Sequence, residues 1–258
     1  MALLLMAACK NQKSEQPVVE AEQPAETETA APDAAVDLQV NPIMHASMVL
    51  GWNEQTVYID PVGELSWYDG QPDADIILIT DIHRDHMDAE ILKELIKENT
   101  KLVVPQAVAD SLTSLQAELI VLNNGESTSH MGLNIEAIPM YNLREEAMHF
   151  HPKGRGNGYV LEEDGFRTYI SGDTEGTPEM LALENIDVAF VSVNLPYTMS
   201  EKQAAEAVAV FQPKTLYPYH YRGSVGFSNM EAFKLWLGKQ EGGQNVNVVQ
   251  LDWYPTYQ

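Results

Sequence analysis

Short apolar runs separated by turn residues dominate the chain from about residue 40 onward. The runs are rich in Val, Ile, Leu and Tyr, and Gly, Pro, Asn or Asp bound most of them, which is typical of β-strands. We therefore predict strands at 45–52, 56–60, 75–80, 101–105, 118–122, 133–139, 157–163, 166–171, 188–193, 215–220 and 246–253.

Apolar residues spaced three and four apart predict helices between these strands. Asp88 is placed to cap one helix, and Ser200 with Gln203 and Ser228 with Glu231 form two predicted capping boxes. The predicted helices span 89–99, 108–116, 204–211 and 232–238. Interspersed strands and helices, without a repeat or a proline-rich break after residue 40, favour one α/β domain at 40–258, with two packed sheets flanked by helices.

The N-terminal segment differs from the rest in composition. Residues 1–9, "MALLLMAAC", are similar to a bacterial lipoprotein signal whose cysteine is acylated after cleavage. Residues 10–39 are rich in Glu, Ala, Pro and Thr and poor in aromatics, which predicts a disordered acidic tether. We therefore expect a lipid anchor at Cys9 in the bacterial cell envelope, periplasmic or at the outer membrane; the alternative is an apolar terminus with an ordinary thiol.

Net charge and cysteine content exclude some classes of partner and of site. The 258 residues carry a formal net charge of −23, which opposes approach to a phosphate backbone, so nucleic acid is not an expected partner. The single cysteine excludes an intramolecular disulfide and a CxxC site. The expected partner is a small-molecule substrate, with membrane contact only through the anchor.

The segment "ITDIHRDHMD", Ile79 to Asp88, joins a predicted buried strand to several ligand-type side chains. In extended chain, residues two apart point to the same side, so Asp81 and His83 can address one cation. The chain then tightens, which lets Asp85 and His86 turn to a second point. Carboxylate oxygen and imidazole nitrogen suit zinc, manganese or iron, so one loop could serve two metal ions.

Further ligand candidates stand at strand ends elsewhere in the chain. Asp173 follows one predicted strand, His220 ends another, and His149 and His151 precede a third. Ligands carried at strand ends along the whole chain are what a cleft at the edge of two sheets requires. By contrast, the glycine-rich "KGRGNGY" lacks the Lys-Ser/Thr pair of a P-loop and precedes no helix, so we interpret it as a tight turn.

Together these motifs resemble the metallo-β-lactamase superfamily of metal-dependent hydrolases. Its THxHxDH signature corresponds to "TDIHRDH", followed by "SGDT" and "YPYHYR", and the similarity covers about residues 40–258. The stretches "HPKGRGNGYVLEEDG" and "NLPYTM" look closest to the branch of L-ascorbate-6-phosphate lactonase and the N-acylphosphatidylethanolamine phospholipases. The resemblance implies a four-layer αβ/βα sandwich with the site at one edge.

The resemblance also implies a ligand assignment for two divalent ions, zinc first. The first ion would bind Asp81, His83 and His151; the second would bind Asp85, His86 and His220, with Asp173 bridging both. Asp81 stands where the signature has histidine, and this oxygen ligand shifts the preference of the first site toward manganese or iron. The "HPKG" similarity favours His151 over His149.

The expected reaction is hydrolysis of an ester, lactone or phosphodiester by a metal-bridging hydroxide. Asp85 would orient the nucleophile or act as general base. Substrate contacts are expected from the same strand edge, at Asn194, Tyr197, Tyr221 and Arg222. His45 could contact substrate or pair within the sheet, and we favour the sheet. Two alternatives keep the ligands without hydrolysis: diiron redox chemistry, and a lipoprotein that only binds metal or ligand.

Overall fold

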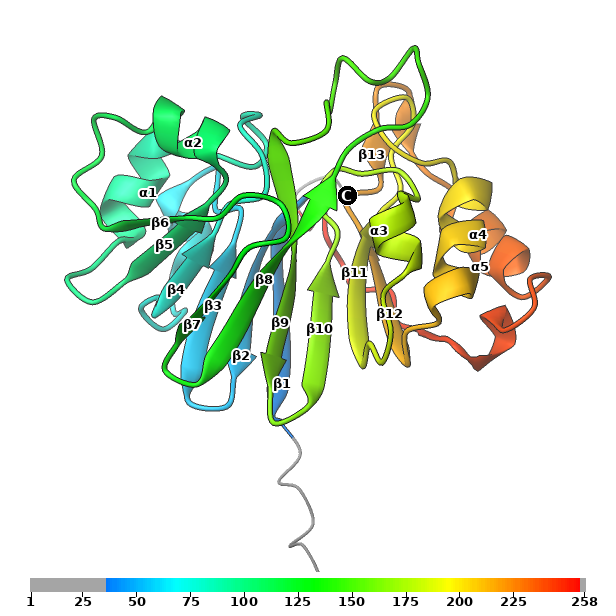
Figure 1. The fold of residues 1–258 in the computed structure, drawn as a ribbon, viewed down its shortest axis with the longest axis horizontal. Helices are drawn as coiled ribbons and strands as arrows, with labels where there is room; N and C mark the ends of the chain where they lie inside the picture. Colours follow the sequence, from blue (N-terminus) through cyan, green and yellow to red (C-terminus); the bar gives the residue numbers. More distant parts are fainter. Residues whose placement is uncertain (1–35, 256–258) are drawn as a thin grey trace, which may run out of the picture. The chain divides into compact units, whose positions relative to one another are not determined.

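Two β-sheets form the centre of the folded unit in the computed structural model, which describes residues 36–255 (Figure 1). The predicted signal segment at 1–9 and nearly all of the predicted tether lie outside the described residues. The first strand begins at Leu38, inside the segment expected to be tether, so the folded unit starts slightly before residue 40.

The first sheet has six strands in sequence order. They are β1 (Leu38–Met44), β2 (Ser47–Trp52), β3 (Gln55–Ile59), β4 (Ile76–Leu78), β5 (Lys101–Val104) and β6 (Leu119–Val121). Strands β1 to β3 are antiparallel, and β3 to β6 are parallel. All three residues of β4 are buried, as expected for a parallel strand covered on both faces.

The second sheet has seven strands in the order β15-β12-β11-β10-β9-β8-β7. They are β7 (Ser127–His130), β8 (Leu133–Met140), β9 (Gly156–Glu163), β10 (Phe166–Ile170), β11 (Val188–Ser192), β12 (Thr215–Tyr219) and β15 (Asn247–Val248). Strands β10, β11, β12 and β15 are parallel. A small hairpin of β13 (Arg222–Gly223) and β14 (Gly226–Phe227) follows β12.

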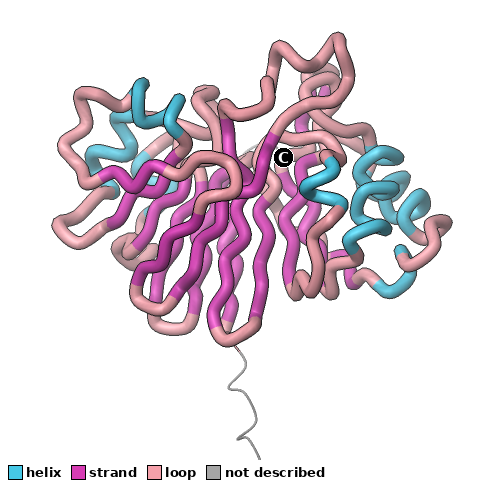
Figure 2. The backbone as a smooth tube through the Cα atoms, in the orientation of Figure 1, coloured by secondary structure: helices cyan, strands magenta, loops and turns pink. Residues whose placement is uncertain are grey.

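Helices flank the two sheets. In Figure 1, α1 (Ala89–Leu95) and α2 (Gln106–Ser111) lie beside β4 to β6, and α3 (Pro178–Leu181), α4 (Glu201–Phe211) and α5 (Met230–Leu237) lie beside β11 and β12. Two short 3-10 helices, η1 (Leu65–Tyr68) and η2 (Gly243–Asn245), complete the elements. Figure 2 shows the strands gathered between the helices, with long loops at one edge. The fold is the expected four-layer αβ/βα sandwich.

Two of the three predicted helix caps are confirmed. Asp88 caps α1, and Ser200 with Gln203 forms the capping box of α4. The capping box predicted at Ser228 is wrong, because Asn229 caps α5 by accepting from the backbone N–H of Ala232. The Ser228 hydroxyl instead donates to the carbonyl of Val193.

Most predicted strands are present, and the differences lie at the edges. Strand β15 keeps only two residues of the predicted 246–253. The edge strands β1 and β7 were missed. Strand β1 contains Pro42, which an edge position tolerates, and β7 has the polar sequence "STSH". Among the described residues, the structure has no helix long and apolar enough to span a bilayer.

A close backbone approach joins the two sheets beneath one edge. Thr80, just after β4, accepts a hydrogen bond at 2.9 Å from the backbone N–H of Asn157 in β9. Gly172, just after β10, has φ +59°, and a Cβ there would lie 2.4 Å from Met140 Sδ and 3.1 Å from Thr80 Cβ. Only glycine fits this seam, because both the space and the backbone conformation exclude a side chain.

Candidate metal centre

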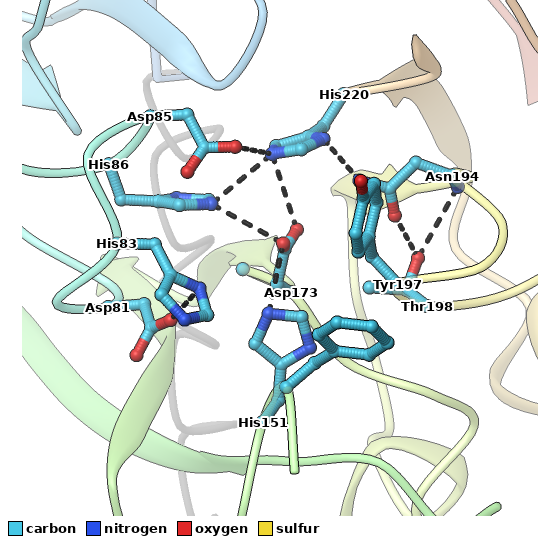
Figure 3. A network of polar contacts seen from close by, with 12 residues as sticks. Asp81, His83, Asp85, His86, His151, Asp173, Asn194, Tyr197, Thr198 and His220 are labelled. Carbon is cyan, nitrogen blue, oxygen red and sulfur yellow. Dashed lines mark hydrogen bonds and ion pairs between the residues drawn. The ribbon is translucent and has the colours of Figure 1, made fainter. Parts of the chain in front are cut away.

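The parallel strands deliver ligand-type side chains to this same edge. Strand β4 leads into Asp81, β10 into Asp173 and β12 into His220, because the carboxyl ends of parallel strands meet at one edge. Strand β9 runs antiparallel to β10, so the loop that precedes it also arrives there. Figure 3 shows the seven predicted ligands gathered at this edge: Asp81, His83, Asp85, His86, His151, Asp173 and His220.

The predicted second site is a tight cluster around His220. The Nε2 atom of His220 lies 3.2 Å from Nε2 of His86, 3.5 Å from Oδ2 of Asp85 and 3.5 Å from Oδ1 of Asp173. His86 Nε2 also lies 3.5 Å from Asp173 Oδ2. A tetrahedral zinc ion with bonds of about 2.0 to 2.1 Å separates its ligand atoms by roughly 3.3 to 3.4 Å. The donor atoms of His86, Asp173 and His220 all lie within 4.8 Å of one another, so their spacing fits a metal ion, and Asp85 adjoins this group through His220.

Asp173 gives a second indication of a cation. Its Oδ1 atom is buried and accepts no hydrogen bond from any residue that the structure describes. A buried carboxylate oxygen without a donor is costly unless a positive charge compensates it. Its Oδ2 atom lies 3.2 Å from Nε2 of His151, on the side away from His220, so Asp173 faces both predicted sites.

The electrostatic field at this cluster favours positive charge. Burial raises the pKa of Asp173, but His220 and His86 outweigh this effect and hold it well below the ordinary value. Burial lowers the pKa of His86, yet the surrounding carboxylates of Asp60, Asp173 and Asp85 raise it well above its ordinary value. A field that binds a proton this firmly also attracts a divalent cation, which takes the proton's place.

Outer partners hold the distant nitrogen of three of the histidines. Nδ1 of His86 lies 2.7 Å from Asp60 Oδ2, and the amide of Asn194 lies 2.6 Å from Nδ1 of His220. Nδ1 of His151 lies 3.2 Å from the amide of Asn142. Fixing one ring nitrogen orients the other toward the centre. Sequence reasoning missed Asp60 and Asn142, and it gave Asn194 a substrate contact rather than this position.

The predicted first site has a different environment. Arg155 reaches Asp81 with two hydrogen bonds, from Nε to Oδ1 at 3.0 Å and from Nη2 to Oδ2 at 2.8 Å. His83 places Nδ1 at 2.9 Å from Asp81 Oδ2 and Nε2 at 3.3 Å from Arg155 Nη2. The atoms of Asp81, His83 and His151 lie within 4.8 Å of one another, but a guanidinium shares the space. Sequence reasoning missed Arg155.

The structure shows where two further histidines, His149 and His45, lie. His149 is exposed and stacks on Phe150, whereas His151 is buried in the cluster. The expectation that His45 pairs within a strand is wrong, because it lies in the turn between β1 and β2. Its Nε2 atom lies 3.5 Å from Asp85 Oδ2 and its Nδ1 atom lies 2.7 Å from the Tyr254 hydroxyl. Burial and then His220 lower the pKa of His45 to about 4.

The site backbone is strained at three of these positions. His45, Asp60 and His220 have φ values of 58°, 46° and 47°, in the left-handed region that residues other than glycine rarely adopt. Such strain persists only where the surrounding structure imposes it, and it gathers at functional sites. Here it aims three side chains of the cluster.

A cavity of about 310 Å³ opens over the cluster. Its lining includes the predicted substrate residues Asn194, Tyr197 and Arg222. Tyr221 is not part of this lining; it is buried, with its ring 5.0 Å from that of Tyr254. A larger hollow of about 570 Å³ beside β8 is lined by no histidine or cysteine, so the smaller cavity is where metal chemistry can meet a substrate.

Comparison with known proteins identifies the family of this chain. A family described as the β-lactamase superfamily domain matches residues 39–220. A UPF0173 metal-dependent hydrolase of Thermococcus onnurineus is 32% identical over 156 residues, which cover 58% of this chain and 67% of that protein. The crystal structure of a protein named as a metal-dependent hydrolase from Parabacteroides distasonis is 36% identical, with a TM-score of 0.75, covering 85% of this chain and 94% of that chain.

A more distant structure shares the fold alone. The metallo-β-lactamase fold protein YhfI of Bacillus subtilis is 11% identical, with a TM-score of 0.64, covering 82% of this chain and 95% of that chain. The family match extends over more than half of the chain. The chain therefore belongs to the metallo-β-lactamase superfamily, and it is a metal-dependent hydrolase.

Proposed function

We propose that the chain hydrolyses an ester, lactone or phosphodiester bond of a small molecule with a divalent metal ion, zinc first, at the second site. The observation that carries this proposal is the cluster of His86, Asp173 and His220, whose neighbouring donor atoms lie 3.2 to 3.5 Å apart under a cavity. Asp85 adjoins the cluster at 3.5 Å from His220. When bound, the ion supplies a water of lowered pKa and polarises the oxygen of the bond that is cleaved.

The residues around the cavity have separate tasks in this proposal. The Asp85 side chain is 45% exposed and lines the cavity, so it can accept a hydrogen bond from the attacking water. Burial raises the pKa of Asp85, but His86 and His220 outweigh this effect and keep the carboxylate ionised. His45 contacts the same carboxylate and fixes its direction. Arg222, at the cavity wall, is placed to bind an anionic group of the substrate.

The choice of zinc, with manganese or iron as alternatives, follows from the chemistry of the ligand side chains. Two imidazole nitrogens and two carboxylates suit zinc, and they also accept manganese or iron. The expectation of a second ion at Asp81, His83 and His151 stays a prediction, because those residues share their space with Arg155.

One experiment tests the proposal directly. The purified protein is analysed for metal and then assayed on lactone, carboxyl ester, phosphodiester and β-lactam substrates, with and without a chelator. We expect hydrolysis of one class that a chelator abolishes, and Asp173→Ala should lose activity and metal together. Iron with oxygen consumption and no hydrolysis would favour redox chemistry instead, and bound metal without turnover would favour a binding protein.

The cellular place of the enzyme is a separate proposal that rests on the sequence of residues 1–39 alone. We propose a lipid anchor at Cys9 that holds the enzyme in the bacterial cell envelope. Cells that express the chain are grown with labelled palmitate, and the label should enter the wild type but not Cys9→Ser. Equal labelling of both proteins would contradict the anchor.

A further inference from the structure

Arg155 contacts two of the three residues of the predicted first site, Asp81 and His83. Its Nε and Nη2 atoms donate to both oxygens of Asp81, and Nη2 also donates to the backbone carbonyl of Phe150. The Asp81 side chain is fully buried, and 18% of the Arg155 side chain is exposed. The carboxylate that stands in the place of the signature histidine is therefore already paired with a cation of the chain itself.

His83 is tied to the same pair. One of its ring nitrogens lies 2.9 Å from Asp81 and the other lies 3.3 Å from the guanidinium of Arg155. Figure 3 shows His83 beside Asp81, apart from the group in which His86 and His220 meet Asp173. A ligand nitrogen must direct its lone pair at the metal ion, and here both nitrogens of His83 are engaged elsewhere.

A guanidinium differs from other cationic groups that a metal ion could displace. A histidine or lysine can lose its proton when a metal ion approaches, but arginine stays charged at any pH that a protein survives. An ion at Asp81, His83 and His151 would meet a fixed positive charge, and expelling Arg155 would break its paired bonds to a buried carboxylate. At the second site, the neighbouring carboxylates of Asp60, Asp173 and Asp85 attract a cation.

We infer that the Arg155 guanidinium takes the place of the first metal ion, so that the chain binds one divalent ion, at Asp85, His86, Asp173 and His220. This inference rests on the metal centre of the proposed function. Asp81 and His83 then serve as partners of Arg155, and His151 serves as a partner of Asp173, whose Oδ2 lies 3.2 Å from its Nε2. The carboxylate of Asp81, which replaces the signature histidine, and the guanidinium of Arg155 thus form one ion pair.

Counting ions tests the inference without any substrate. Metal-free protein is titrated with Co²⁺, and absorption in the visible region and bound metal give the number of ions. We expect one ion per chain in the wild type and two in Arg155→Met. The dissociation constant of an ion at Asp81, His83 and His151 should be at least about tenfold lower in the variant than in the wild type, which is the lower end of the effect of residues that contact metal ligands. Electron paramagnetic resonance should show coupled ions only in the variant.

Two further variants keep the test decisive. Arg84→Met removes an exposed positive charge from the same loop without touching Asp81, and it should keep one ion. Asp81→His with Arg155→Met removes both members of the buried pair and restores the signature histidine, so it should bind two ions even if Arg155→Met alone folds poorly.

The outcomes separate the two proposals. Two ions of similar affinity in the wild type would overturn the inference and leave the proposed function standing. One ion in both the single and the double variant would overturn it as well, because Arg155 would then not be what limits binding. Absence of any bound ion in the wild type would contradict the proposed function itself.

Discussion

The two halves of the metal centre contain similar donors and differ in what surrounds them. In the second site, His86 and His220 direct Nε2 at Asp173, while Asp60 and Asn194 hold their distant nitrogens. In the first site, both nitrogens of His83 face an ion pair. The comparison suggests a rule: ligand-type residues can hold a metal ion where their lone pairs point at one place and no arginine is already paired with them.

The largest expected effect compares one histidine from each half. His86→Ala should lose the bound ion and lower kcat/KM by more than roughly 100-fold, the upper end of what an outer-shell partner costs. His83→Ala should keep one ion and lose less than about tenfold, below the cost of a lost outer partner. Metal analysis and kcat/KM on the identified substrate measure both. Equal losses of metal in the two variants would remove the distinction between the halves.

A smaller effect is expected from the outer partners. Asp60→Asn removes the charge that holds Nδ1 of His86, and it should weaken metal binding by about 10- to 100-fold. Asn142→Ala is the counterpart beside His151, and its effect on the dissociation constant should fall short of about tenfold. Titration with a competing chelator measures both constants. A stronger effect of Asn142→Ala than of Asp60→Asn would reverse the ranking of the sites.

Metal removal should also lower the stability of the fold. Zinc at about 100 times its dissociation constant stabilises the folded state by about 2.7 kcal/mol, which raises Tm by roughly 5 to 10 °C in a domain of this size. The shift should survive in His83→Ala and vanish in His86→Ala. Thermal unfolding with zinc and with chelator provides the measurement, and a zinc-dependent shift that only His83→Ala abolishes would place the ion in the first site.

The smallest effect concerns the substrate. Arg222→Ala should raise KM roughly tenfold for an anionic substrate, since a charged hydrogen bond contributes about 1.4 kcal/mol or more, and it should leave kcat nearly unchanged. Tyr197→Phe keeps the ring that lies 5.1 Å from Phe150 and serves as the control on the other side of the cavity. Steady-state kinetics on one charged and one neutral substrate separate the two. An unchanged KM for the charged substrate in Arg222→Ala would exclude this contact.

The sequence predicts most strands and two of the helix caps, because each depends on local chemistry. The seven candidate ligands also lie together at one edge, but their binding of metal stays a prediction. Candidate ligands are recognisable in the sequence where a buried strand is followed by "DIHRDH", and Asp173 and His220 stand where strands end. The glycine-rich segment also forms the predicted turn, with Gly154 at φ 87°. These features need no knowledge of what packs against them.

The outer partners could not be found in this way. Asp60 directly follows strand β3 and is separated from His86 by 26 residues, and its role depends on the parallel pairing of β3 with β4. Asp60 and Asp173 both follow a strand, and this position alone does not distinguish a metal ligand from a residue that holds a ligand histidine. Arg155 meets Asp81 across 74 residues, because β9 starts at the edge where β10 ends. Such pairs follow from topology, which periodicity does not specify.

The seam at Gly172 and Thr80 has a consequence for how such an enzyme can change. Thr80 directly precedes the ligand loop of the first sheet, and Gly172 directly precedes Asp173 of the second. The span between the two groups of donors thus depends on the close packing of Gly172 against the side chains of Met140 and Thr80. A single added methyl group at Gly172 would push these segments apart and change the distance between Asp173 and the loop after Thr80, without replacing any of the candidate ligands.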